Sequence, residues 1–255
     1  MISNISLRLL FLSLSLLFIG TVSGWAIVEK LNGAEEDLEF LYFGATVTAV
    51  IFCVQCGIYI RMRGRVFLGL LFLATFGLSL CWFMAALFIP LLWVDIVGWE
   101  TKLMMVLLLI GLIASNVAES FRIFDRKWSA LEDSLRVTIL KRKDGFLDWD
   151  NLILWMKFSP DLYVPFLPKS LSAFLSVIMV LSMLTGFSLR NIFPEVSVFL
   201  VGVPAAIAIS YFFQQIGFNL AQARRVRALE HECKALLCQK SGEGEARKRV
   251  RKKIS

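Results

Sequence analysis

The sequence predicts an all-α, polytopic integral membrane protein with six transmembrane helices, four before and two after a central polar block. Hydrophobic residues make up 58% of the 255 residues and the mean hydropathy is +0.72, whereas soluble domains contain about 45–50% apolar residues. Charged residues make up only 18% and gather in a few blocks between long apolar runs. Because a helix needs about 20 apolar residues to cross a bilayer, these runs predict spanning helices.

Four apolar runs, at residues 7–28, 41–60, 66–92 and 103–118, form a first unit of residues 1–120. Two more runs, at 170–189 and 196–217, are joined by a short connection and are expected to form a transmembrane hairpin, unit 170–217. The first run also resembles a secretory signal peptide cleaved near residue 24. Its continuation to Val28 favours a retained span, and the remaining topology is the same either way.

Basic residues set the expected orientation, because Lys and Arg in short loops stay on the cytoplasmic side. With the N-terminus inside, 24 of the 27 Lys and Arg residues fall in inner segments, and only Lys30, Lys102 and Arg190 fall outside. Both termini are therefore expected in the cytoplasm, in an inner or plasma membrane. The last four residues, Lys-Lys-Ile-Ser, also match a di-lysine retrieval signal, which would indicate the endoplasmic reticulum membrane in a eukaryotic host.

The central block, residues 121–169, is predicted to begin with a cytoplasmic amphipathic helix continuous with the fourth span. Glu132 and Arg136 form a favourable pair on its polar face. A second, short helix is expected after Asp148 or Asp150. The apolar face of the first helix has to be buried on the membrane, against the bundle or by a docking partner. This face has spacings of three and four residues and comprises Phe121, Phe124, Trp128, Leu131 and Leu135.

The last unit, residues 218–255, is predicted to continue the sixth span as a helix, followed by a flexible hinge at 241–245 and a basic run. Near a bilayer such a run is expected to bind anionic lipid headgroups, at about 1 kcal/mol per residue, or a protein partner. Without aromatic interleaving or a recognition fold, nucleic acid is not favoured. The basic run comprises Arg247, Lys248, Arg249, Arg251, Lys252 and Lys253.

Small residues four positions apart predict where spanning helices pack closely, because they let two backbones approach. Pro204, in the sixth span, is a candidate kink. Most of this packing is expected within one chain, and homo-oligomerisation is the alternative. The small residues are Gly20 and Gly24 in the first span, and Gly202, Ala206 and Ser210 in the sixth.

No catalytic residue, cofactor or metal site is predicted. Cys53 and Cys56 form a CxxC pair, but they are expected in the inner half of a span, where buried thiols are inert. The single histidine, His231, lies beside Glu230, Glu232 and Cys233. One His and one Cys are too few ligands for a zinc site unless protomers share it. The sequence also contains neither a P-loop nor a GxSxG motif, so an enzyme is not expected.

Charged residues inside a membrane mark ion and substrate paths, and none lies in the middle of an expected span. Glu119 comes nearest, beside Asn116, and is expected to reach interfacial water or a basic neighbour. Gln55, Gln214 and Gln215 suit hydrogen bonds between helices. These residues are too sparse to indicate a coupled transporter.

The expected function is therefore a non-catalytic scaffold or assembly subunit of a membrane complex, which presents its cytoplasmic helices and basic tail to partners or to anionic lipid. The alternative is a channel-like or transporter-like protein with a homo-oligomeric pore. A redox enzyme built on Cys53 and Cys56 ranks third.

Overall fold

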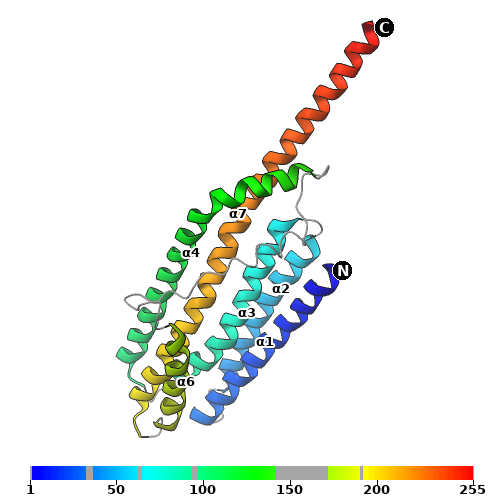
Figure 1. The fold of residues 1–255 in the computed structure, drawn as a ribbon. Helices are drawn as coiled ribbons and strands as arrows, with labels where there is room; N and C mark the ends of the chain where they lie inside the picture. Colours follow the sequence, from blue (N-terminus) through cyan, green and yellow to red (C-terminus); the bar gives the residue numbers. More distant parts are fainter. Residues whose placement is uncertain are drawn as a thin grey trace.

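The structure is a computed structural model that describes residues 2–32, 37–62, 65–93, 97–141, 172–189 and 192–254. Figure 1 shows the bundle and, at one end, a single helix that extends beyond it. The all-α prediction is confirmed in the described part, which contains no strand. Its elements are α1 (Ile2–Asn32), α2 (Asp37–Arg61), α3 (Val66–Trp93), α4 (Trp99–Lys141), α6 (Ser172–Leu189) and α7 (Pro194–Ile254).

Five of these helices, α1, α2, α3, α4 and α7, are long and apolar enough to cross a membrane. The chain is therefore a multi-pass integral membrane protein. The described apolar part of α6, Val177–Gly186, is shorter. α6 nevertheless packs against α7, since Ser182 Oγ donates a hydrogen bond of 2.6 Å to the Leu200 carbonyl and Ser197 Oγ one of 2.7 Å to the Gly186 carbonyl.

The centre of the bundle is formed by α3 and α7. α7 contacts α3, α4 and α6, and α3 also contacts α1 and α2. A core cluster between α3, α4 and α7 contains Phe88, Met105 and Val201. Because lipid tails are as apolar as these side chains, close packing rather than hydrophobic transfer holds the helices together inside the bilayer.

The small residues lie at these helix contacts. A Cβ added at Gly24 would lie 2.7 Å from the Phe40 ring, and one at Gly202 would lie 2.6 Å from Met105 Cε. Gly20 lies close to the backbone of Phe83. Ala206 and Ser210, on α7, are fully buried. All five small residues thus face neighbouring helices of the same chain.

α4 and α7 both extend past the length of a span. α4 runs for 43 residues without a break, so the fourth span and the amphipathic helix are one element, as the spacing predicts. α7 runs for 61 residues and continues through Pro204. The second cytoplasmic helix expected after Asp148 or Asp150 lies outside the described residues.

The hinge predicted at residues 241–245 is wrong, because α7 is helical throughout this stretch. A glycine inside a helix costs about 1 kcal/mol relative to alanine, which weakens a helix but does not end it. Gly242 and Gly244 stand among Glu, Ala, Lys and Arg residues, which are good helix formers. The helix therefore continues to Ile254.

Candidate functional site

The candidate site is the pair of helices formed by the C-terminal part of α4 and the adjacent part of α7, which lie side by side at one end of the bundle (Figure 1). An apolar cluster, called here the α4–α7 interface, joins them. It contains Phe124, Trp128, Leu135 and Ile139 of α4; Phe218, Ala221, Ala223, Val226, Leu229 and Cys233 of α7; and Val66 and Leu70 of α3.

Aromatic rings form the end of this interface nearest the spanning helices. Phe124 contacts Trp128 at 5.3 Å between ring centroids, and it meets Phe218 edge-on at 5.7 Å and 85°. Such pairs contribute about 0.5–1.5 kcal/mol beyond the burial of their area. The rings therefore hold α4 against α7 at the end of the interface nearest the spanning helices.

The interface uses most of the apolar face predicted on α4. Phe124, Trp128 and Leu135 are buried, and they contact the chain's own α7 and α3. Phe121 is 43% exposed. Leu131 lies in α4, but its side chain is outside the described part. Of the expected ways to bury this face, packing against the bundle is the one observed for the three buried residues.

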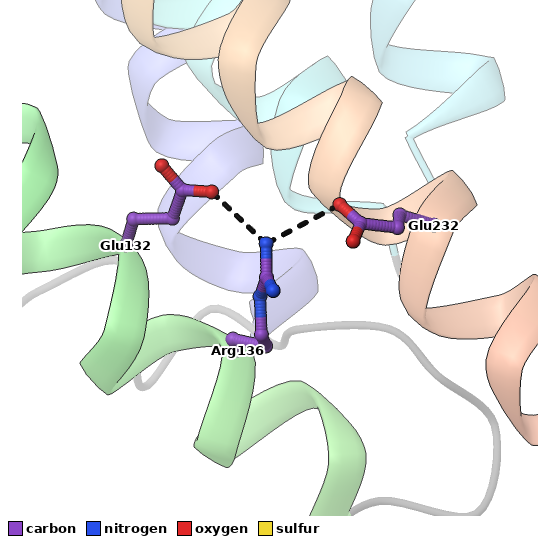
Figure 2. A network of polar contacts seen from close by, with 3 residues as sticks. All are labelled: Glu132, Arg136 and Glu232. Atoms are coloured by element: carbon purple, nitrogen blue, oxygen red, sulfur yellow. Dashed lines mark hydrogen bonds and ion pairs between the residues drawn. The ribbon is translucent and has the colours of Figure 1, made fainter.

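Ion pairs connect α4 and α7 at the edge of the interface. Figure 2 shows Arg136 between two carboxylates: its Nη2 donates to Glu132 Oε1 at 3.1 Å and to Glu232 Oε2 at 3.4 Å. Asp125 of α4 lies 3.7 Å from Arg225 of α7. The Glu132–Arg136 pair was expected from spacing along one helix. The two pairs between helices were missed, although opposite charges on two amphipathic stretches are a signal for them.

Cys233 lies inside the interface and Cys238 outside it. Burial raises the pKa of the Cys233 thiol; Glu232 raises it further and Arg136 lowers it. His231 is exposed. Cys53 is exposed and Cys56 half-buried on α2, and none of the five cysteines, all within the described residues, is in a disulfide. Within the described residues, no three His, Cys, Asp or Glu side chains are arranged to hold a metal ion.

Polar side chains of α4 and α7 also meet inside the bundle. Asn116 Nδ2 donates to the Leu112 carbonyl at 3.0 Å and to Ser210 Oγ at 3.2 Å. Gln214, one turn further along α7, is completely buried, and neither atom of its amide has a hydrogen-bond partner. Glu119 reaches a basic neighbour as expected, since its Oε2 lies 3.8 Å from Arg122 Nη1.

Gln55, where α1, α2 and α3 meet, differs from Gln214 because its amide is hydrogen-bonded. Its Oε1 accepts from Ser13 Oγ at 2.6 Å, and its Nε2 donates to Ser79 Oγ at 2.8 Å and to the Thr75 carbonyl at 2.9 Å. Both the oxygen and the nitrogen of this buried amide therefore make hydrogen bonds to neighbouring helices, as expected from the sequence.

The basic run, residues 247–253, forms the last two turns of α7; its side chains lie outside the described part. The site therefore combines a closed helix pair with a basic helix end beyond it. No protein-family model, curated protein or solved structure matches this chain.

Proposed function

We propose that this protein is a non-catalytic scaffold or assembly subunit of a membrane complex. The observation that carries the proposal is that α4 and α7 both run past the length of a span and are joined there by the α4–α7 interface and its ion pairs, with α7 extending further, beyond the bundle. A spanning helix needs about 20 residues, whereas these helices have 43 and 61. Such a rigid extension suits the binding of a partner.

We further propose six spans with both termini in the cytoplasm. α6, with 18 residues, falls within the range of about 17–25 residues that can cross a bilayer. The start of α1, the end of α2, the start of α3 and the C-terminal parts of α4 and α7 lie at one end of the bundle (Figure 1). Arg61, Arg65 and Arg126 belong to that end, which supports a cytoplasmic location.

Single cysteines in a cysteine-free variant test the orientation. Glu100 and Lys141 are exposed at opposite ends of α4. We expect Glu100→Cys, and not Lys141→Cys, to react with a membrane-impermeant maleimide on intact cells. The reverse pattern would show that the termini face outward. The same cells, stained for the protein, distinguish an inner or plasma membrane from the endoplasmic reticulum alternative.

Native mass spectrometry of the protein, gently extracted from its own membrane, tests the scaffold proposal. We expect a heteromeric complex that is lost when Arg126→Glu and Asp133→Lys are combined, because both residues are exposed on the C-terminal part of α4, past its apolar span. The matched control combines Glu100→Lys with Lys102→Glu at the opposite end of α4, where the net charge is likewise unchanged. Equal loss from both pairs, or no partner at all, would contradict the proposal.

The second candidate function is a homo-oligomeric channel-like or transporter-like protein. It is favoured by Gln214, whose buried amide has no protein partner, since unsatisfied polar groups inside a membrane are costly and often functional. A homo-oligomer in the mass spectrum, together with conductance in planar bilayers that Gln214→Leu abolishes, would support this candidate over the scaffold.

A further inference from the structure

The basic tip of α7, defined as residues 247–253, carries six Lys and Arg residues in seven positions. Because α7 is one continuous helix from Pro194 to Ile254, the tip is the end of a rod. In Figure 1 the red end of α7 extends alone, away from the bundle, in the same direction as the rest of the helix. The tip therefore does not lie along the bundle.

The tip is far from the membrane that the protein spans. Arg225 already lies beyond the apolar part of α7, where it is exposed and faces Asp125. Arg247 follows 22 residues later, which is about 33 Å at 1.5 Å per residue. Attraction between exposed charges is screened over about 8 Å at physiological salt. Headgroups of the same membrane are thus outside the range of the tip.

Binding of the tip to those headgroups would require α7 to bend back. The expected hinge at 241–245 would have allowed this, but that stretch is helical. The α4–α7 interface extends along α7 as far as Cys233, and the side chains described from 234 to 239 are exposed or half-buried. α7 is therefore accessible beyond the interface.

We propose that the basic tip binds an acidic segment, rich in Asp and Glu, of a soluble protein at a distance from the membrane. This inference rests on the proposed scaffold function and names the chemistry of one partner. Binding needs no covalent chemistry: carboxylates pair with the Lys and Arg side chains and displace their counterions. The attraction speeds encounter and selects the partner by charge.

The charge pattern favours an acidic protein segment over nucleic acid. The tip is about 10 Å long, at 1.5 Å per residue, and Glu245 and Glu243 lie two and four positions before its first residue, Arg247. Duplex DNA carries a negative charge about every 1.7 Å of its axis, so its phosphates would continue alongside these glutamates. A protein segment can end its acidic run there, and like-charge repulsion from Glu243 and Glu245 then fixes the register.

The test uses the full chain in nanodiscs of phosphatidylcholine, with a fluorescent poly-glutamate peptide as the probe. Arg249→Gln with Lys252→Gln removes two charges from the tip. The control, Arg61→Gln with Arg65→Gln, removes two exposed charges from the end of α2 and from the residue before α3. We expect the tip variant to weaken peptide binding about tenfold and the control to change it less than about twofold, because only the tip pairs with the peptide.

Two further measurements test whether lipid headgroups or nucleic acid bind the tip instead of an acidic protein segment. Adding phosphatidylserine to the nanodisc should leave the affinity for the peptide unchanged; competition by that lipid would overturn the proposal in favour of headgroup binding. Duplex DNA should bind more weakly than the peptide at equal salt, and tighter, tip-dependent binding of DNA would overturn it as well. Equal weakening by both variants, or no binding of the peptide, would also refute it.

Refutation of the role of the tip can be distinguished from refutation of the scaffold function. The native complex can survive in the tip variant, which would refute the role of the tip alone. Loss of the complex in the tip variant, while the control keeps it, is the result expected if the tip holds a partner.

Discussion

Arg136 of α4 and Glu232 of α7, 96 positions apart in the chain, are joined by an ion pair of 3.4 Å between Nη2 and Oε2. The same nitrogen binds Glu132, so one guanidinium connects a carboxylate of its own helix with one of the neighbouring helix (Figure 2). The Arg136 side chain is 39% exposed and that of Glu232 51%. Exposed ion pairs contribute about 0.2–1 kcal/mol, so this one aligns two helices that apolar contacts hold together.

The first prediction compares the apolar contacts with this ion pair. Trp128→Ala should lower the free energy of unfolding by about 3–5 kcal/mol, because it opens a cavity in a buried cluster. Arg136→Gln should lower it by less than about 1 kcal/mol. Thermal unfolding in mild detergent measures both, and Phe121→Ala, at an exposed position on the same helix, is the control. Equal losses from Trp128→Ala and Arg136→Gln would mean that the charges hold the helices together.

The second prediction concerns cysteine reactivity. Only the thiolate reacts with maleimide, and the pKa of Cys233 is raised by burial, so less thiolate is present near neutral pH. In variants that keep a single cysteine, we expect Cys238 to react at least about tenfold faster than Cys233. Raising the pH towards the pKa should accelerate labelling of Cys233.

Opening the α4–α7 interface should remove this protection. Trp128→Ala should increase the labelling rate of Cys233 and leave that of Cys238 unchanged, because Cys238 is exposed. Equal rates at the two cysteines in the otherwise intact protein would show that α4 does not cover α7 in solution.

The helices and their amphipathic character were predictable from sequence because both depend on local patterns. The apolar spacing of Phe124, Trp128 and Leu135 identifies one face of a helix, and the run of apolar residues before it identifies a span. The partner of that face was not predictable, since α7 begins more than 50 residues after α4 ends. Several surfaces could have buried the same aromatic side chains.

Two other features, the continuity of α7 and the hydrogen bonding of the buried glutamines, depend on neighbouring residues and on packing, which residue spacing does not show. Gly242 and Gly244 suggested a hinge, because glycine lowers helix propensity, but helix-forming neighbours keep α7 continuous. Gln55 and Gln214 are alike in sequence, since each is an amide within an apolar run. Only packing distinguishes them, because Ser13, Thr75 and Ser79 meet Gln55, whereas nothing polar meets the amide of Gln214.

The third prediction tests close helix packing. A Cβ at Gly24 would lie 2.7 Å from the buried Phe40 ring and 3.1 Å from the Ala86 carbonyl oxygen, so neighbours on two sides would have to move. Gly24→Ala should destabilise the protein by about 1–3 kcal/mol, as overpacked cores do. Gly111→Ala is the control, because nothing lies within 4 Å of its added Cβ.

The control should be neutral or stabilising by up to about 1 kcal/mol, because alanine favours a helix more than glycine does. Both variants are compared by thermal unfolding in the same detergent. A Gly24→Ala protein as stable as the Gly111→Ala protein would show that α1 does not approach α2 and α3 this closely.

The fourth prediction contrasts the two buried glutamines, whose replacement by leucine should have opposite effects. Gln55→Leu removes three hydrogen bonds and leaves Ser13 and Ser79 without this partner, so it should destabilise the protein by about 1–2 kcal/mol. Gln214→Leu removes an amide that makes no hydrogen bond. An unsatisfied buried polar group costs about 1–3 kcal/mol, so this variant should be more stable by up to that amount. Unfolding in one detergent gives both signs, and destabilisation by Gln214→Leu would show that its amide is satisfied in the folded protein.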